Sequence, residues 1–241
     1  MNYFPLVAFP LTLSIIFSCS SEGLATVLKA SQRMAGFSTD SRHYIYLESS
    51  RNPVTDVPTA QIQIINVANS SCVRNGCLET EYDRSAYNLS NQAAENDLLE
   101  KTLMLRQRLE LNRLKVGIQL PVISRQRTPN ETETVNFRLN KQTEPLQIRL
   151  EQRYIPSVLS GGSSPVDRAA MRLIINYNYR QLTLGNLNNY RDAVRNYSIR
   201  EVRLSPNQRN AVVLIDMTQP SEEGVLQTTL VQSFSLEPFG I

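Results

Sequence analysis

Two cysteines close together in the chain have the clearest chemistry. Cys72 and Cys77 enclose four residues that end in Asn75-Gly76, a pair that favours a tight turn. A turn there brings two strand ends together, so we predict a structural disulfide, a bond that oxidising compartments allow and the cytosol rarely does. A zinc site or a redox-active pair is less favoured, because zinc needs four ligands and redox pairs usually have two intervening residues.

The single histidine gives little support for a catalytic triad. His43 begins the run His43-Tyr44-Ile45-Tyr46-Leu47, which is rich in aromatic and β-branched residues and is typical of a strand. No Gly-x-Ser-x-Gly motif supplies a nucleophile. A structural or surface role for His43 is therefore favoured, and we predict no catalytic residues.

Carboxylate pairs keep a hydrolase open as an alternative. Asp40 with Glu48, or Asp83 with Asp216, could act as acid and base in glycoside hydrolysis. Sugar-binding clefts usually contain aromatic platforms, however, and the chain has no Trp. The candidates for a small platform are Tyr177 and Tyr179, for which ordinary packing is the simpler interpretation.

Charge and glycine motifs argue against other classes of function. The chain has 25 Lys and Arg against 22 Asp and Glu, a net charge of +3, whereas nucleic-acid binding needs a concentrated basic patch. Gly161-Gly162 does not fit a Rossmann or P-loop pattern, and no calcium loop is present in the sequence. We therefore predict no cofactor, no metal and no nucleic-acid partner.

The N-terminus is typical of an export signal. Phe4 to Phe17 are apolar or small apart from Thr12 and Ser14, and this run is shorter than the roughly 20 residues that span a membrane. We predict a signal peptide over residues 1–25. Cleavage near Gly23-Leu24-Ala25 is one option; the other is a lipoprotein signal that ends before Cys19, which would carry the lipid.

No second hydrophobic segment follows, so the mature chain is expected to be soluble or tethered by lipid only, in the periplasm or outside the cell. Residues 26–241 would form a secreted β-rich domain. The polar, glycine-containing segment 160–165 is the best candidate for a division into two domains; a surface loop within one domain is the alternative.

Hydrophobic periodicity predicts mostly strands and one long helix. Residues 92–110 have a helical stripe, with Ser90 as the cap. Apolar residues alternate from Leu114 to Val122, which predicts an edge strand with one buried face, because Pro121 cannot donate to a central ladder. The other strands are expected at 43–47, 60–67, 134–139, 146–154, 171–184, 199–204, 210–215 and 226–236.

One short motif occurs twice. Phe37 to Leu47 aligns with Leu204 to Leu214, and each copy is followed by a loop with proline and a second strand. The polar side chains can fix a turn by bonding to the local backbone. The paired turn positions are Ser38 with Ser205, Asp40 with Asn207, and Arg42 with Arg209. β-Propeller blades repeat a similar turn and strand, and chance similarity of hairpins is the alternative.

Ala35 to Tyr46 and Ala60 to Ala68 resemble a family of predicted secreted bacterial proteins catalogued as a domain of unknown function. Members of that family have a Gly-Phe-Ser-Pro-Asp-Gly-Arg-Tyr type of turn and strand, then a hydrophobic strand that ends in Asp-Val-Ala. Thr39, Ser41 and Asn66 depart from this pattern. The resemblance implies secretion and no known active site.

The sequence therefore predicts a mainly β fold with one long helix, or an α+β fold, as an antiparallel β-sandwich or propeller-like sheets. The predicted function is that of an exported, non-enzymatic binding or interaction module that recognises an unknown envelope protein or polymer. A secreted hydrolase with a carboxylate pair, or a lipid-anchored structural subunit of an envelope assembly, is the alternative.

Overall fold

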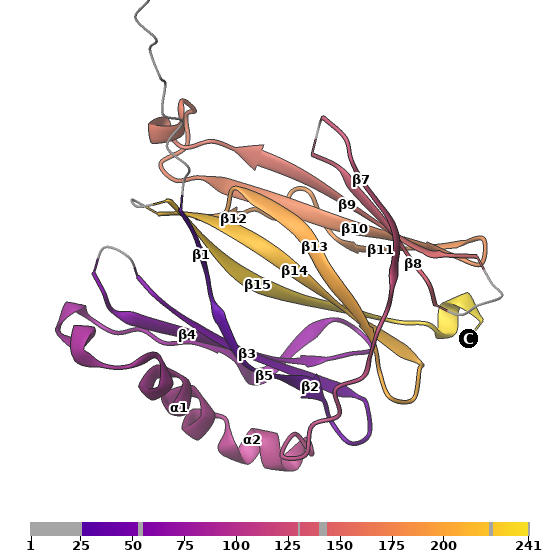
Figure 1. Ribbon diagram of the computed structural model, residues 1–241, viewed down its shortest axis with the longest axis horizontal. Coiled ribbons are helices and arrows are strands. Elements are labelled where there is room, and N and C mark those ends of the chain that lie inside the picture. The colour runs from indigo at the N-terminus through magenta and orange to yellow at the C-terminus, as the bar shows by residue number, and fades with distance from the viewer. Residues whose placement is uncertain (1–25, 53–54, 130, 140–143, 222–223, 241) are drawn as a thin grey trace, which may run out of the picture.

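Three β-sheets and a helical segment are stacked in four layers in the computed structural model (Figure 1). The structure describes residues 26–52, 55–129, 131–139, 144–221 and 224–240. The predicted signal peptide over 1–25, with Cys19, lies outside these residues. The prediction of a mainly β fold is confirmed, and the layers run from the helices through the first and the central sheet to the third sheet.

The first sheet is an antiparallel meander in sequence order. Its strands are β2 (Ser31–Phe37), β3 (His43–Arg51), β4 (Pro58–Asn66) and β5 (Ser71–Glu79). The next segment covers one face of this sheet with η1 (Arg84–Asn88), α1 (Asn91–Lys101) and α2 (Leu103–Arg108). Ala94 and Leu98 of α1 pack on Ile45, Ile62 and neighbouring side chains, because alternation along the strands turns those residues outward from the stack.

The predicted helix over 92–110 is two helices. Ser90 caps α1 as expected, accepting a hydrogen bond from the Ala93 amide at 3.1 Å. The break lies at Thr102, whose buried hydroxyl donates to the Leu98 carbonyl at 2.7 Å. Such back-bonding competes with the helical pattern, so α2 begins as a separate turn.

The central sheet is buried on both faces. Its order is β1 (Thr26–Lys29), β15 (Gly224–Ser235), β14 (Asn210–Ser221), β13 (Asn196–Leu204) and β6 (Ile118–Gln119). In β14, Val212 and Leu214 pack toward the first sheet, while Ala211, Val213 and Ile215 pack toward the third. A strand that is covered on both sides is apolar at consecutive positions, which is what the sequence of β14 shows.

The third sheet is again antiparallel. It contains β11 (Arg180–Gly185), β10 (Arg168–Tyr177), β9 (Leu146–Ile155), β8 (Glu133–Phe137) and β7 (Val122–Arg127), with β12 (Arg191–Asp192) also paired to β10. Two short helical turns complete the described elements, η2 (Val158–Ser160) and η3 (Glu237–Phe239). The segment 160–165 lies in the connection between β9 and β10, which are neighbours in this one sheet.

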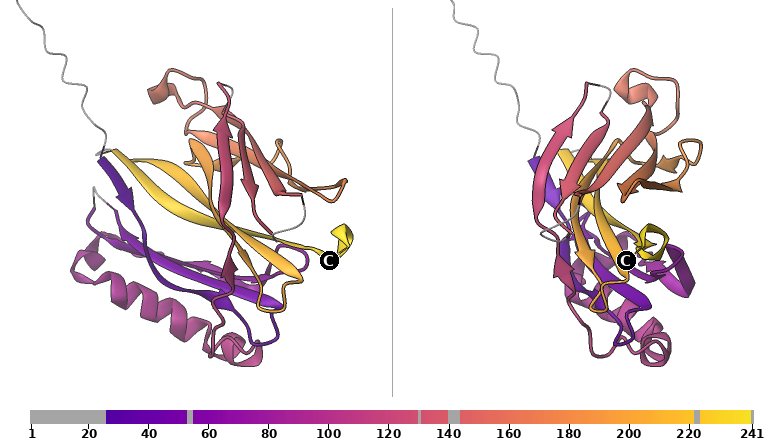
Figure 2. Two further views of the ribbon diagram at one scale, coloured as in Figure 1. Left: turned by 45° about the vertical axis from the view of Figure 1, so that its right-hand side comes forward. Right: turned by 90° about the vertical axis from the view of Figure 1, so that its right-hand side faces the viewer.

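The first strand of the described chain joins the last one. β1 pairs with β15 in parallel, from Thr26 opposite Gly224 to Lys29 opposite Gln227. At Ala30 the chain leaves the central sheet and enters β2 of the first sheet. The central sheet therefore combines β1 from the start of the described chain with β13, β14 and β15 from its end (Figure 2). Its other edge strand, β6, comes from the middle of the sequence.

The alternating segment 114–122 is not the strand with one buried face that its pattern predicts. Within it, Ile118–Gln119 forms a two-residue strand at a sheet edge and Val122 begins β7, while Val116 and Ile118 are more than half exposed. Gly117 has φ of +76°, and a Cβ atom there would lie 2.3 Å from the Leu204 carbonyl oxygen. This left-handed residue turns the chain, so the alternation does not continue on one face.

Candidate functional site

A polar cleft separates the first sheet from the central sheet beyond the end of β1. The last backbone hydrogen bond between the β1 segment and β15 is donated by the Ala30 amide to the Gln227 carbonyl at 3.0 Å. From Thr229 onward, the outer edge of β15 has no strand partner in the described part of the chain. Backbone groups at such an edge need other hydrogen-bond partners when they are buried.

Side chains of the first sheet take the place of a missing strand. Gln63 donates to the Thr229 carbonyl at 2.6 Å and accepts from the Val231 amide at 3.0 Å. Further along the edge, the Ser70 hydroxyl accepts from the Ser233 amide at 2.8 Å. The glutamine amide therefore copies the donor and acceptor of a backbone peptide and joins the two sheets.

Glu48 is the most deeply buried carboxylate of the cleft, with 1% of its surface exposed. It accepts from the Thr229 amide at 2.6 Å, from the Thr229 hydroxyl at 2.7 Å and from the side-chain amide of Gln61. No cation pairs with it among the residues described. A buried carboxylate without a cation depends on such neutral donors, which explains why all three converge on it.

A second polar chain extends from the same threonine. The Thr229 hydroxyl lies 3.0 Å from the Tyr46 hydroxyl, which accepts from Arg200 at 2.9 Å. Burial, and next the charge of Glu48, raise the pKa of Tyr46. Arg200 also pairs with Asp216, so these groups form one network from the first sheet through the central sheet.

The cleft consists of two adjoining cavities of about 180 and 310 Å³. Both are lined by Gln61, Glu79, Arg191 and Met217, and one reaches Glu48 while the other reaches the disulfide. Serine, threonine and glutamine side chains line both cavities, together with aliphatic residues. A cavity of this size and polarity suits a small polar molecule or one side chain of a larger ligand.

Glu79 and Asp192 are the exposed carboxylates of this cleft, and Asp192 pairs with Arg168. The Glu79 side chain makes no hydrogen bond or ion pair within the described structure, and partial burial followed by the nearby charge of Glu81 raises its pKa. Strand register places Glu48 opposite Gln61, and Gln61 opposite Glu79. The two carboxylates thus lie in one row across three strands, with Glu48 saturated by donors and Glu79 open to a ligand.

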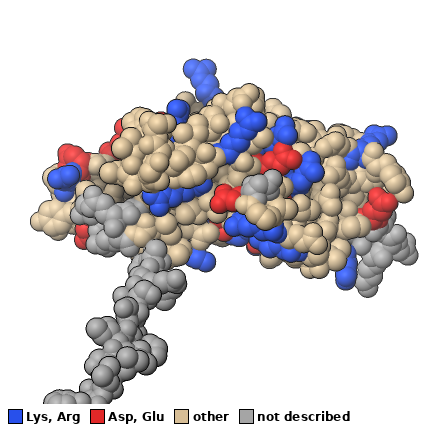
Figure 3. All heavy atoms as spheres, turned by 90° about the horizontal axis from the view of Figure 1, so that it is seen from above, with Lys and Arg blue, Asp and Glu red and all other residues tan. Residues whose placement is uncertain are grey.

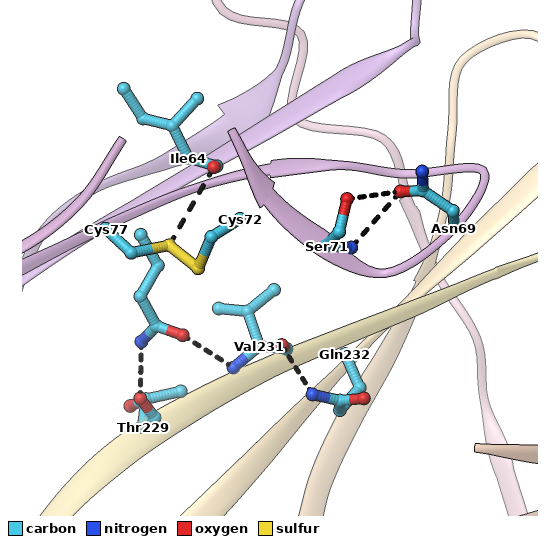
Figure 4. The surroundings of a disulfide bond; sticks show 9 residues. Ile64, Asn69, Ser71, Cys72, Cys77, Thr229, Val231 and Gln232 are labelled. Atoms are coloured by element: carbon cyan, nitrogen blue, oxygen red, sulfur yellow. Dashed lines mark hydrogen bonds between the residues drawn. A yellow bond between two sulfur atoms is a disulfide. The ribbon is translucent and has the colours of Figure 1, made fainter. Parts of the chain in front are cut away.

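The predicted disulfide between Cys72 and Cys77 is present, with 5.8 Å between the Cα atoms. It does not tie two strand ends together; both cysteines belong to β5, where the bond closes a bulge opposite Ile64. Asn75 there has φ of +61°, in keeping with the predicted turn. Figure 4 shows the disulfide facing the part of β15 that contains Thr229 and Val231, at the rim of the cleft.

The two predicted turn motifs have the same hydrogen bonds. Ser38 donates to Asp40 at 2.6 Å, and Ser205 donates to Asn207 at 2.6 Å. The backbone amides of the two arginines, Arg42 and Arg209, donate to Asp40 at 3.0 Å and to Asn207 at 3.2 Å. Both serines are fully buried, and each is the first residue of the turn in a hairpin, Ser38 between β2 and β3 and Ser205 between β13 and β14.

The similarity extends further back than the motif suggests. Each turn is preceded by a β-bulge, at Arg33 in β2 and at Arg200 in β13, five residues before the serine in both cases. Arg33 pairs with Glu95 of α1 at 2.6 Å, and Arg200 pairs with Asp216. Arginine at both bulges is the sequence signal that would have revealed this extension.

The carboxylate pairs considered from the sequence are not brought together. Asp40 lies in the turn before β3, whereas Glu48 lies five residues into that strand, about 17 Å further along at 3.3 Å per residue. Asp83 caps η1 on the helical layer, while Asp216 pairs with Arg200 in the central sheet. The row formed by Glu48 and Glu79 was missed, because only strand register brings them together.

The aromatic and histidine candidates have other surroundings. Tyr177 is 3% exposed and packs edge-on against Phe239, while Tyr179 lies in the following turn and is 95% exposed, so they form no common platform. Burial lowers the pKa of His43, whose Nδ1 atom is buried. Within the described ranges, there is no cluster of three or more metal-ligating side chains and no helix with the length and apolar character to cross a bilayer.

Comparison with known proteins gives a family and no activity. Neither a curated protein nor a solved structure matches the chain. A family described as predicted secreted protein, a domain of unknown function, matches residues 54–233. The matched region includes Glu79, the disulfide and the second turn motif, and begins after the first. Because it spans most of the sequence, the chain belongs to this family of predicted secreted proteins.

Proposed function

We propose that this protein is a non-enzymatic binding module of the cell envelope, and that its ligand enters the cleft between the first and central sheets. The observation that carries the proposal is the open carboxylate of Glu79 beside a wall of fixed polar side chains. Gln61, Gln63 and Thr229 are held by hydrogen bonds between the sheets. Such a wall is preorganised, so a ligand would be bound without ordering it further.

The chemistry of the cleft favours a ligand with a positively charged amine. Glu79 offers an acceptor without a partner, and the lining holds no aromatic ring to stack on a sugar. A lysine side chain or another amine of an envelope protein or polymer fits the cavity of about 310 Å³. Ionised Glu79 would pair with such an amine, and serine, threonine and glutamine would hydrogen-bond to its neighbours.

Calorimetric titration with the tripeptide Gly-Lys-Gly tests this proposal. The parent protein should bind it, and Glu79→Gln should weaken binding by about tenfold or more, since a charged hydrogen bond is lost. Glu100→Gln, at an exposed position of α1, is the matched control and should bind like the parent. Binding should also weaken as the pH falls toward the raised pKa of Glu79. Equal affinity of Glu79→Gln and parent, or no binding by either, would refute the proposal.

A hydrolase is the second candidate, favoured by the row of Glu48 and Glu79. Two strand spacings separate their backbones by about 9–10 Å, and inverting glycoside hydrolases hold their two carboxyl groups about 6.5–9.5 Å apart. Hydrolysis of chromogenic glycosides by the parent, and its loss in both Glu48→Gln and Glu79→Gln, would support this candidate. Full activity in Glu79→Gln would exclude it.

The proposed location in the cell envelope is supported by the family of predicted secreted proteins and by the predicted N-terminal signal peptide. Mass spectrometry of the native protein should find a start near residue 26, or at a lipid-modified Cys19, in the exported fraction. For the lipid-anchored subunit, Cys19→Ala should lose both a lipid-precursor label and the membrane fraction. An intact Met1 in the cytosol with reduced Cys72 and Cys77 would contradict export.

A further inference from the structure

An apolar tip projects from the third sheet. The connection between β9 and β10 forms η2, where Val158 is 65% exposed and Leu159 is 98% exposed. Tyr154 and Val166 flank the tip and are each about two-fifths exposed. Exposed single leucines are common, but two adjacent aliphatic side chains at the end of a projecting loop are what interfacial insertion requires.

The tip is held from beneath by a buried carboxylate. Asp167 is 2% exposed and accepts from the Ser157 amide, the Tyr154 hydroxyl and Arg195, each at 2.7 Å. Ser160 adds two further bonds, donating to Asp167 at 3.2 Å and accepting from Arg195 at 3.0 Å. These bonds attach both sides of η2 to the sheet, so Val158 and Leu159 are presented by a fixed loop.

Positive charge surrounds the tip. Arg153 lies in β9 just before the connection, and its nearest polar partner is the neutral side chain of Asn188 at 3.5 Å. On the adjacent β7–β8 hairpin, Arg125 and Arg127 share the single carboxylate of Glu133. Two acidic side chains also lie near the tip: Glu131 lines a shallow hollow with Leu159, and Asp192 pairs with Arg168 at the start of β10. Figure 3 shows basic groups spread over this end of the molecule, with acidic groups at fewer places.

The described chain also begins at this end. The start of β1 and the loop between β9 and β10 both lie in the upper half of the molecule in Figures 1 and 2, whereas α2 lies at the lower end. Position, charge and apolar exposure therefore agree on one face.

We propose that this end of the protein docks on the surface of an anionic lipid bilayer, with Val158 and Leu159 inserted among the headgroups and the arginines over the lipid phosphates. A stable protein interface buries about 800 Å² on each partner, more than two aliphatic side chains can offer. A bilayer needs only a small apolar insertion together with attraction of basic residues. This inference does not depend on the ligand of the cleft.

Tryptophan fluorescence gives a direct test, because the chain contains no Trp. The protein is purified after export, without residues 1–25, so that neither the apolar N-terminal run nor a lipid on Cys19 can contribute, and Leu159→Trp provides the only indole. With vesicles of phosphatidylglycerol and phosphatidylcholine, its emission should shift to shorter wavelength. With phosphatidylcholine alone, it should stay unchanged. Met104→Trp is the matched control, since Met104 is 75% exposed on α2 and should show no shift with either vesicle.

Co-sedimentation with the same vesicles separates the two contributions. Val158→Asp with Leu159→Asp should abolish binding. Arg153→Glu should weaken binding by about tenfold or more, because it replaces a positive charge near the anionic lipid with a negative one. Far-ultraviolet circular dichroism confirms that the variants are folded. The proposal is overturned if the parent binds neither vesicle, if the aspartate variant binds like the parent, or if crosslinking from the tip captures a protein while vesicles do not bind.

Discussion

The carboxylate of Glu48 in β3 binds Thr229 in β15 twice, at the backbone amide and at the hydroxyl, across 181 positions of sequence. This double contact joins the first sheet to the unpaired edge of the central sheet. Its strength comes from charge, since ionised acceptors make shorter and stronger hydrogen bonds than neutral ones. The buried position makes its loss costly.

Glu48→Ala should therefore lower the free energy of unfolding by about 3 kcal/mol, because the Thr229 amide and hydroxyl and the Gln61 amide lose their acceptor. Urea unfolding followed by circular dichroism measures this change. Glu100→Ala, on the exposed side of α1, should stay within about 0.5 kcal/mol of the parent. A loss no larger than in this control would mean that the cleft opens and water replaces the carboxylate.

Asp167 should make the protein sensitive to acid. Burial raises the pKa of its carboxyl, but the bonds from Ser157, Tyr154, Arg195 and Ser160 outweigh burial, and the pKa lies well below the ordinary 3.8. The unfolded chain thus binds the proton more readily, so the stabilisation is complete above about pH 5 and is lost as the pH falls through 3.8 and below.

Asp167→Asn should remove this part of the pH dependence. Its unfolding free energy should be lower than that of the parent by about 2–4 kcal/mol at neutral pH, and the difference should shrink in acid. Thermal unfolding between pH 7 and pH 3 measures both curves. Parallel curves for parent and variant would show that Asp167 does not bind its proton more weakly in the folded state.

Removing the disulfide should cost stability without unfolding the protein. The bond between Cys72 and Cys77 closes a short loop, for which chain entropy predicts about 2 kcal/mol. Cys72→Ser with Cys77→Ser should lower the unfolding temperature, and reductant should lower that of the parent by a similar amount. The double variant is its own control, because reductant should leave it unchanged; a shift there would point to another effect of the reductant.

The two buried turn serines should be equivalent in energy. Ser38→Ala and Ser205→Ala each remove a hydroxyl that accepts from the next strand, from the His43 amide at 3.0 Å and the Asn210 amide at 3.1 Å. Each should lower the unfolding free energy by about 1–3 kcal/mol. Pro206→Ala, at an exposed position of the second turn, should have a smaller effect. If the two losses differ by more than about 1 kcal/mol, the two turns would have the same hydrogen bonds but contribute differently to stability.

Local patterns predicted what depends on local physics. The disulfide follows from the spacing of Cys72 and Cys77, and the alternation around Ile62 and Ile64 correctly indicated β4. Ser90 was correctly identified as a helix cap, since capping involves only residues of the first turn. The turn at Ser38 likewise uses side chains two positions apart.

Long-range contacts could not be inferred in this way. The alternation near Gly117 suggests a strand, yet the Leu204 carbonyl leaves no room for a side chain there. Glu48 and Gln63 look like ordinary solvent-facing residues of half-buried strands until β15 is placed against them. Register across three strands, which also sets Glu48 and Glu79 in one row, is a property of the assembled sheet.

The parallel pairing of β1 with β15 has a consequence for how the protein matures. The first sheet and the third sheet each come from a continuous stretch of chain and can form as soon as that stretch is free. The layer between them needs the earliest and the latest strands together, and it supplies the apolar surface that both outer layers cover. If such a chain crosses a membrane with its N-terminus first, the pairing of β1 with β15 cannot form until almost the whole chain has emerged.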